Sequence, residues 1–334
     1  MASIVRKGAD PRELTHINHK CLGCGICVDI CPTQSLKLGP ILPIARGILK
    51  MDFINLQKDT CVLCGLCSFA CPVGGLDFKI NNENLKENPN YPKWECGSKV
   101  EEEKCLYCGN CKKACPRDAI FIRRILPKRK DLVIGKTEIY KDKCIYCGVC
   151  KELCPADAIT ISRNDINPSK QFIDYNIEID EDKCVYCGIC KKACSEEAIK
   201  IVCSTCMDNE KIPEIKANGD IVLDQDTCIY CGWCEEICPV DAAKVIKPFE
   251  GEVVINTEIE CKGNSCHACQ DVCPCNAISM VDNASKINPK MCMLCGACRK
   301  ACPQSILDVK RTEMRLKNIH SNSWQKILGT LLNR

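Results

Sequence analysis

The sequence predicts an α+β fold in which four small domains follow one another, each held together by metal more than by a large core. Three observations support this. Cysteine makes up 36 of the 334 residues, a proportion typical of covalently or metal-stapled chains. One cysteine pattern recurs eight times, and a short strand of alternating apolar and polar residues follows each copy. Aromatic residues make up only 5%, so no large aromatic core is available.

The repeated pattern is clearest at residues 144–155, which read Cys-Ile-Tyr-Cys-Gly-Val-Cys-Lys-Glu-Leu-Cys-Pro. The spacing C-x2-C-x2-C-x3-C followed by proline is the bacterial-type ligand run for [4Fe–4S] clusters. Three closely spaced thiolates hold one cluster, and the fourth ligates the other cluster of a two-cluster domain. One helical turn is expected between the third and fourth cysteines, and glycine after the second lets the backbone approach the cluster closely.

The eight runs supply 32 candidate ligands for eight [4Fe–4S] clusters. In chain order they are Cys21, Cys24, Cys27 and Cys31; Cys61, Cys64, Cys67 and Cys71; Cys105, Cys108, Cys111 and Cys115; Cys144, Cys147, Cys150 and Cys154; Cys184, Cys187, Cys190 and Cys194; Cys228, Cys231, Cys234 and Cys238; Cys261, Cys266, Cys269 and Cys273; and Cys292, Cys295, Cys298 and Cys302.

Zinc and disulfides are the alternatives for so many cysteines. Structural zinc sites take two C-x2-C pairs separated by a longer loop, whereas a third cysteine two residues further on favours a cubane cluster. Disulfide scaffolds suit secreted chains, and residues 1–10 have neither an apolar signal segment nor a cleavage site. We therefore expect iron–sulfur clusters in a reducing cytoplasm.

Pairing consecutive runs predicts four two-cluster domains and a tail. Their ranges are 12–80, 98–163, 176–248 and 252–310, with a docking tail at 311–334. The polar stretch 81–97 is interpreted as a linker. A nested arrangement, in which the third and sixth runs close around the fourth and fifth, is left open by the sequence.

The tail at 311–334 contains no cysteine and is basic. Its apolar residues recur at helical spacing, so the sequence predicts an amphipathic helix that either docks a partner or packs on its own domain. These residues are Trp324, Ile327, Leu328, Leu331 and Leu332.

Two runs depart from the pattern. Ser195 replaces the proline of the fifth run, which predicts a less rigid turn there. The seventh run is wider between its first two cysteines, and His267 replaces the usual glycine, so a different loop is expected. Four cysteines belong to no run, and the sequence leaves their roles open. They are Cys96, Cys203, Cys206 and Cys275.

Other classes of function are not indicated. No stretch reaches the roughly 18 apolar residues of a membrane span. The formal charge of +3 counts the cysteines as neutral, so lysines and arginines are interpreted as compensating anionic clusters, not as a nucleic-acid surface. The motifs of P-loop, dinucleotide-binding, zinc-protease and serine-hydrolase sites are absent. We therefore expect an electron carrier that has no active site of its own.

Eight such runs in one chain resemble the polyferredoxins of methanogenic archaea, which are strings of bacterial-type two-cluster ferredoxin domains. Within that family, the cluster number and the segment 266–277 are similar to the polyferredoxin subunits of tungsten- or molybdenum-containing formylmethanofuran dehydrogenases.

This resemblance implies a chain that relays low-potential electrons to the tungsten or molybdenum catalytic subunits of that enzyme during CO2 reduction. It also implies a heterodisulfide reductase or a ferredoxin as a possible electron donor. Two alternatives stay open: a polyferredoxin serving a hydrogenase or heterodisulfide reductase system, and a free electron reservoir. The choice between tungsten and molybdenum is also open.

Overall fold

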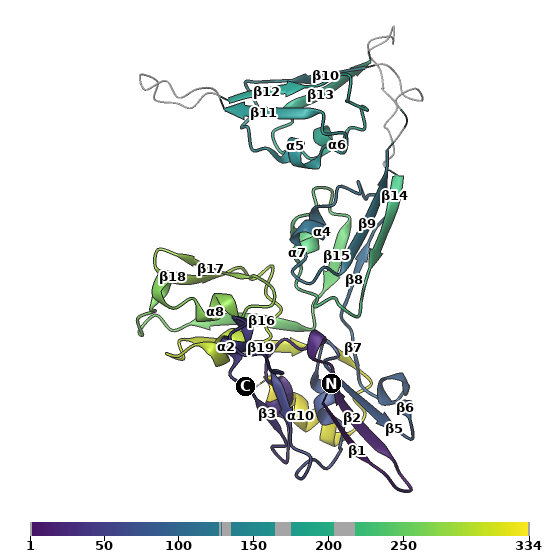
Figure 1. Cartoon of the computed structure of the whole chain (residues 1–334), viewed down its shortest axis with the longest axis vertical. Helices are drawn as coiled ribbons and strands as arrows, with labels where there is room; N and C mark the ends of the chain where they lie inside the picture. Colours follow the sequence, from purple (N-terminus) through teal and green to yellow (C-terminus); the bar gives the residue numbers. More distant parts are fainter. Residues whose placement is uncertain (1, 127, 129–134, 164–174, 204–217, 333–334) are drawn as a thin grey trace. The chain divides into compact units, whose positions relative to one another are not determined.

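The computed structural model describes residues 2–126, 128, 135–163, 175–203 and 218–332 (Figure 1). The chain forms two compact units. Unit 1 comprises residues 1–98, 224–236 and 245–334, and unit 2 comprises residues 99–223 and 237–244. Strands β8 (Gly97–Val100) and β15 (Ala243–Ile246) span the positions where the chain passes from one unit to the other.

The last domain shows the repeated architecture most simply. Its first strand pairs antiparallel with its last strand, the two middle strands form a hairpin, and one short helix accompanies each cysteine run (Figure 1). Burial alternates along the last strand: Leu307, Val309 and Arg311 face the core, and the residues between them face solvent. The elements are β16 (Phe249–Ile255), α8 (Ala268–Asp271), β17 (Ile278–Val281), β18 (Ala284–Ile287), α9 (Ala297–Ala301) and β19 (Leu307–Met314).

The first domain repeats this arrangement and extends it. A hairpin forms in the middle, and the outer pair is widened to a four-stranded sheet in the order β1-β2-β5-β6. The N-terminal strand β1, which pairs with β2, was not predicted from the sequence. The elements are β1 (Ser3–Arg6), β2 (Arg12–His16), α1 (Ile26–Asp29), β3 (Leu36–Leu38), α2 (Ile41–Ala45), β4 (Ile54–Leu56), α3 (Leu66–Ala70), β5 (Leu76–Ile80) and β6 (Glu83–Asn84).

Unit 2 has a nested topology. The strand after the third cysteine run pairs with the strand before the sixth run, from Ile120 opposite Leu223 to Ile125 opposite Asn218. A complete two-cluster domain is inserted between these strands, with its outer pair β10–β13 and its hairpin β11–β12. The elements are α4 (Asn110–Ala114), β9 (Ile120–Ile125), β10 (Gly135–Ile139), α5 (Val149–Leu153), β11 (Ile159–Arg163), β12 (Tyr175–Ile179), α6 (Ile189–Lys192), β13 (Ile199–Cys203) and β14 (Asn218–Leu223). Helix α7 (Trp233–Glu236) carries part of the sixth run in unit 1.

This pairing corrects the consecutive arrangement predicted for the middle of the chain. Residues 98–163 and 176–248 are not two successive domains, because the strands of runs four and five pair with each other inside the ribbon of runs three and six. The nested alternative is the one that the structure adopts. The nested arrangement is held by the pairing of β9 with β14, whose register is continuous over six residue pairs.

The predicted linker at 81–97 packs against the first domain. Tyr91 is 6% exposed, and its hydroxyl donates a 3.1 Å hydrogen bond to the carbonyl of Gly65. The indole Nε1 of Trp94 donates to the carbonyl of Phe69 at 3.0 Å. Its short elements are the 3-10 turn Leu85–Glu87 and β7 (Lys93–Trp94), which pairs with β20 (Leu316–Lys317).

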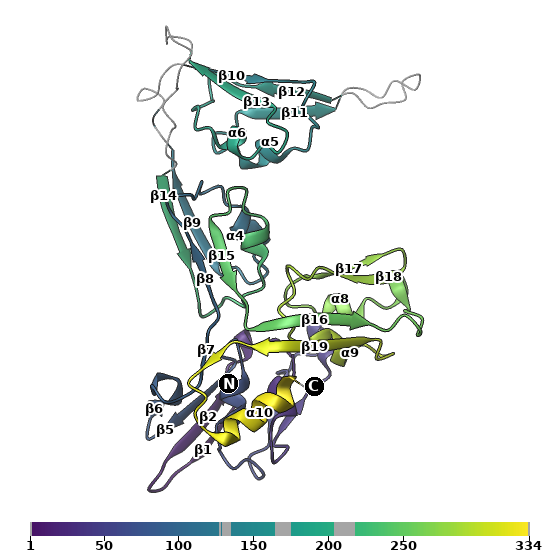
Figure 2. The same cartoon turned by 180° about the vertical axis from the view of Figure 1, so that it is seen from behind.

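The predicted docking tail also packs on its own chain. Helix α10 (Asn322–Leu332) forms where the amphipathic pattern predicts it, and it lies beside β19 (Figure 2). The Trp324 ring lies 4.2 Å from the Phe69 ring and 5.8 Å from the Tyr91 ring, centroid to centroid, and Leu331 is 2% exposed. Unit 1 therefore covers part of this apolar face, as the alternative of packing on its own domain predicts, and the docking role for 311–334 stays a prediction.

We expect Trp324→Ala to release α10 from unit 1. The loss should be roughly 2–3 kcal/mol of local stability, less than for a fully buried tryptophan, because Trp324 is only half-buried. Limited proteolysis should then cleave near residue 320 faster than in the parent. Trp324→Phe is the control, because it keeps a ring against Phe69. Equal cleavage of the alanine variant and the parent would contradict this packing.

Among the described residues, no helix has the length and apolar character needed to cross a membrane.

Candidate metal centres

Each cysteine run folds into a loop followed by a single helical turn. The residue after the second cysteine adopts the left-handed conformation at the helix start, with φ of 73° at Gly25 and 80° at Gly65. Glycine adopts this conformation without strain, which explains its recurrence. In the seventh run His267 takes the same conformation with φ of 53°, and its Nδ1 lies 3.2 Å from Oε1 of Gln270. The half-buried histidine thus replaces glycine as a helix-start residue.

The fourth cysteine of each run is held by a turn that the sequence analysis missed. The third residue beyond it is left-handed in every run, and in seven runs the next backbone N–H donates to the cysteine sulfur at 3.1–3.3 Å. Ser195 leaves this turn intact, because Ala198 still donates to Cys194 Sγ at 3.3 Å. N–H donation to thiolate sulfur stabilises the anionic form and tunes a cluster's potential. The donors are Ser35, Gly75, Ala119, Ala158, Ala198, Ala242 and Ala277.

The first domain brings three cysteines of one run together with the fourth cysteine of the other. Burial, with a smaller contribution from the charge of Cys71, raises the pKa of Cys21 to about 12 and that of Cys24 to about 11. In the second centre, burial raises the pKa of Cys67, and the charges of its own run and of Cys31 add to this effect. This exchange of the fourth ligand is the one that the sequence pattern predicts.

The inserted domain of unit 2 contains two hollows, each lined by four cysteines. The first, of about 410 Å³, is lined by Cys144, Cys147, Cys150 and Cys194. The second, of about 380 Å³, is lined by Cys184, Cys187, Cys190 and Cys154. Isoleucines such as Ile159 and Ile199 form much of the remaining walls, together with tyrosines such as Tyr146 and Tyr186. Two apolar hollows that each present four thiols fit a bulky cluster with four thiolate ligands.

The third run shares its centre with the sixth run, in keeping with the nested strands. Burial raises the pKa of Cys111 to about 12, and the charges of Cys108, Cys105 and Cys238 add to the increase. Cys238 is likewise among the charges that act on Cys105. Pairing the third run with the fourth would have placed Cys154 beside Cys105, Cys108 and Cys111. Cys154 instead lines the hollow of Cys184, Cys187 and Cys190.

The last domain repeats the exchange. Cys273 lines a hollow of about 350 Å³ together with Cys292, Cys295 and Cys298. In the other centre, burial raises the pKa of Cys269 to about 11, and the charges of Cys261 and Cys302 contribute. These contacts place Cys273 in the position predicted for a fourth ligand.

Two of the four extra cysteines lie against the sixth run within unit 1. A hydrogen bond from Cys275 lowers the pKa of the Cys231 thiol to about 7, and Cys275 itself is 2% exposed. Burial raises the pKa of Cys96 to about 11, and Cys96 contacts the hydroxyl of Tyr230. Cys203 ends β13, and Cys206 lies outside the described residues.

The grouping of the donors can be compared with that of a single-ion site. Among the described residues, no three histidine, cysteine, aspartate or glutamate side chains converge as they would around one metal ion. A zinc ion requires thiolates at about 2.3 Å from a common point. Four thiols around one hollow suit the four thiolate ligands of a cubane.

Within each unit, the charge effects between cysteines indicate which centres lie near one another. In unit 1 the charge of Cys67 acts on Cys27, and that of Cys24 acts on Cys295. The charge of Cys269 acts on Cys298, and Cys275 connects Cys231 to Cys295. The centre of Cys292, Cys295, Cys298 and Cys273 therefore has three neighbours, so the arrangement in unit 1 is branched.

In unit 2 the order is linear over the described residues. The charge of Cys150 acts on Cys190 across the inserted domain. Leu106, Leu153 and Ile189 form a small core against which the loops of Cys108 and Cys187 pack. The centre of Cys184, Cys187, Cys190 and Cys154 thus lies between the other two.

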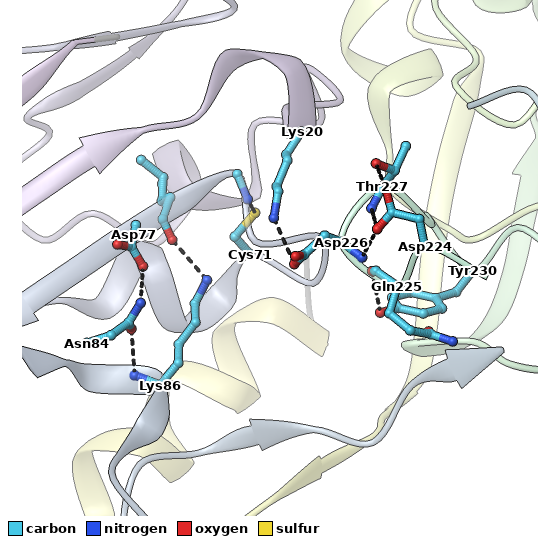
Figure 3. A network of polar contacts seen from close by, with 12 residues as sticks. Lys20, Cys71, Asp77, Asn84, Lys86, Asp224, Gln225, Asp226, Thr227 and Tyr230 are labelled. Atoms are coloured by element: carbon cyan, nitrogen blue, oxygen red, sulfur yellow. Dashed lines mark hydrogen bonds and ion pairs between the residues drawn. The ribbon is translucent and has the colours of Figure 1, made fainter. Parts of the chain in front are cut away.

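A polar network joins the first run to the segment that precedes the sixth run (Figure 3). Lys20, directly before Cys21, forms a 2.9 Å ion pair with Asp226. Asp224 accepts hydrogen bonds from Thr227, and the hydroxyl of Tyr230 donates to the carbonyl of Gln225 (Figure 3). These contacts position the loop that carries Cys228 within unit 1.

Two cysteines with described side chains are exposed, Cys64 and Cys147. Each lies beside exposed apolar residues: Val62 is 53% exposed, and Ile145 and Val149 are 62% and 40% exposed. The other described ligands are buried or half-buried. The centres of Cys64 and Cys147 are therefore the ones that the surface exposes most.

Comparison with known protein families supports this chemistry. Models of the 4Fe-4S dicluster domain match residues 20–75, 60–119 and 143–198, and a second dicluster model matches 97–155. A model of the 4Fe-4S binding domain matches residues 221–244 and 285–308. The dicluster matches together cover residues 20–198, more than half of the chain.

Individual relatives cover shorter stretches. Polyferredoxin protein FwdF of Methanocaldococcus jannaschii is 43% identical over 135 residues, which are 40% of this chain and 38% of that protein. An iron–sulfur subunit of the CoB–CoM heterodisulfide reductase of the same organism is 32% identical over 75 residues, 20% of this chain and 11% of that protein. The chain thus spans well under half the length of these relatives.

The fold also matches a solved structure. A chain of the formate dehydrogenase–heterodisulfide reductase–formylmethanofuran dehydrogenase complex from Methanospirillum hungatei superimposes with a TM-score of 0.63. The match covers 98% of this chain and 88% of that one at 24% sequence identity. It shows that the same string of domains occurs in a chain of that complex.

Proposed function

Because this chain belongs to the 4Fe-4S dicluster domain family, we propose that it is a multi-cluster electron carrier with eight [4Fe–4S] clusters. The observation that supports the proposal is the grouping of three cysteines of one run with the fourth cysteine of its partner run in the first, inserted and last domains. A bound cubane accepts and returns one electron at low potential. The chain supplies the thiolates, the N–H donors that stabilise them, and the packing that brings neighbouring centres into contact.

We infer the following ligand sets for these clusters. The sets are Cys21, Cys24, Cys27 and Cys71; Cys61, Cys64, Cys67 and Cys31; Cys105, Cys108, Cys111 and Cys238; Cys144, Cys147, Cys150 and Cys194; Cys184, Cys187, Cys190 and Cys154; Cys261, Cys266, Cys269 and Cys302; and Cys292, Cys295, Cys298 and Cys273. The remaining four of the 32 cysteines, Cys115, Cys228, Cys231 and Cys234, match the same ligand pattern in sequence and complete the proposed number.

The partner that we propose is the catalytic part of a tungsten- or molybdenum-containing formylmethanofuran dehydrogenase in the cytoplasm. The identity to the FwdF polyferredoxin and the fold shared with a chain of the Methanospirillum complex support this choice. In this role the chain has no active site of its own and relays electrons that a heterodisulfide reductase or a ferredoxin supplies.

Metal analysis of the complex purified without oxygen tests the proposal. About 32 irons per chain are expected from eight cubanes, together with near-stoichiometric tungsten or molybdenum. Nickel without either metal would assign the chain to a hydrogenase system instead. Iron alone, on a chain that elutes by itself, would identify a free electron reservoir.

The exposed centre at Cys147 is the point in unit 2 where we expect an external donor to dock. Ile145→Asp should slow reduction by a reduced two-cluster ferredoxin roughly tenfold, because a charge replaces an apolar contact worth about 1.4 kcal/mol. Stopped-flow absorbance of the full chain measures this rate. Reduction by dithionite should be unchanged, since a small reductant needs no docking surface.

Phe121→Asp serves as the matched control, because Phe121 is 58% exposed on β9 and belongs to none of the hollows. A loss of rate in this control equal to that in Ile145→Asp would contradict docking at Cys147.

A further inference from the structure

A buried arginine lies where the cluster loops of the first and last domains meet in unit 1. Arg311 is on β19 and is 9% exposed. Its Nε donates to the carbonyl of Leu294 and its Nη2 to the carbonyl of Cys295, both at 3.0 Å. Its guanidinium carbon lies 4.8 Å from the centre of the Phe249 ring. The side chain is thus fixed from three directions.

The two loops around Arg311 approach each other closely. The charge of Cys24 is the largest one that acts on Cys295. Lys300, in the helix after Cys298, forms a 2.6 Å ion pair with Asp29, in the helix that carries Cys27. Arg46 of the first domain forms a second ion pair at 2.7 Å with Asp271 of the last domain. The Lys300–Asp29 pair joins the helices that carry Cys298 and Cys27, and the Arg46–Asp271 pair adds a second link between the first and last domains.

The positive charge of Arg311 is directed at thiolates. Among the residues that the structure describes, no carboxylate forms an ion pair with it. Its guanidinium instead donates to the backbone of the loop that carries Cys295. Burying a guanidinium without an anion is costly, so thiolates bound to anionic clusters are the compensation that this position requires.

We propose that Arg311 is a positioning and charge-tuning residue shared by the centre of Cys21, Cys24, Cys27 and Cys71 and the centre of Cys292, Cys295, Cys298 and Cys273. Its fixed charge makes both centres easier to reduce, and its hydrogen bonds hold the two loops in contact. Electrons therefore pass between the first and last domains at this point. The transfer oxidises one centre by one electron and reduces its neighbour by one, with no bond formed or broken. This inference rests on the proposed electron-carrier function.

A comparable arginine in the first domain provides an internal control. Arg12 donates to the carbonyl of Leu63 at 3.0 Å, the same loop position that Leu294 occupies in the last run. Arg12, however, forms a 2.7 Å ion pair with Asp10, and its side chain is 29% exposed. Its charge is therefore neutralised and screened, whereas that of Arg311 is not.

The experiment is a potentiometric titration of the full chain, loaded with iron and sulfide and monitored by low-temperature EPR. Arg311→Met should lower the reduced-to-oxidised ratio of two centres about tenfold at the parent's midpoint, which is a shift of about 59 mV for one electron. Arg311→Lys should restore most of the parent's behaviour because it keeps the charge. Arg12→Met should shift the titration much less.

Iron content and circular dichroism, measured on the same samples, separate tuning from folding. A methionine variant with full iron content that titrates like the parent would overturn the proposal. So would a lysine variant as shifted as the methionine variant, because charge would then not be the cause. If the methionine variant loses iron, Arg311→Gln, which keeps part of the hydrogen bonding, is titrated in its place under the same criteria. The titration uses the chain alone, so its outcome is independent of which catalytic partner co-purifies.

Discussion

Removing iron from the full chain with a chelator should unfold the inserted domain of unit 2 before any other part. Its buried apolar core consists of Cys150, Ile159, Ile177 and Ile199, with half-buried neighbours. The two hollows lined by its cysteines would then lose their occupants. Unfilled apolar space destabilises a core, and a domain this small depends on its staples.

Hydrogen exchange followed by mass spectrometry measures this effect. We expect the strands β10, β11, β12 and β13 to lose protection first when iron is removed. Unit 1 provides the comparison within the same sample, because its core is far more extensive and includes Phe69, Phe249 and Met293. Retained protection of β10 and β13 in the iron-free chain would show that packing alone sustains this domain.

Replacing one ligand of the middle centre in unit 2 should interrupt electron transfer along that unit. Cys190→Ser alters the centre that lies between those of Cys150 and Cys111. We expect a loss of about four irons per chain. Electrons supplied at the exposed centre of Cys147 should then remain there, and transfer onward to the rest of the chain should fall to background.

Rapid-freeze EPR after mixing with a reduced ferredoxin follows where the electrons reside. Cys96→Ser is the matched control, because Cys96 is a half-buried cysteine outside the inferred ligand sets, and we expect it to keep its iron and its transfer rate. Normal onward transfer in Cys190→Ser would contradict the linear order in unit 2 and favour direct exchange between non-adjacent centres.

Much of the local structure could be predicted because it depends on residues close together in the chain. The strands at 120–125, 159–163, 199–203 and 278–281 follow their cysteine runs as the alternating pattern predicts. The single helical turns at the third cysteines form where predicted, since the spacing of the ligands and the preceding left-handed residue both belong to one short loop.

Long-range relationships could not be predicted in the same way. Every run has nearly the same sequence, so the pattern does not distinguish Cys154 from Cys238 as the partner of Cys105, Cys108 and Cys111. The register of β9 with β14 decides this, because it pairs the third run with the sixth. Likewise, the amphipathic pattern of the tail does not show whether its apolar face packs on a partner protein or on its own chain. The aromatic contacts of Trp324 with Phe69 and Tyr91 decide for the chain.

The sequence by itself therefore predicts the chemistry of this protein. It indicates which cysteines form ligand runs and that these runs suit iron–sulfur clusters. It also predicts small α+β domains. Ligand chemistry depends on residue type and short spacing, both of which are visible in the chain before it folds. How the centres are connected depends instead on tertiary packing, because contact between Cys24, Cys295 and Arg311 requires segments from opposite ends of the chain to pack together. Burial and strand register, not local pattern, bring such segments into contact.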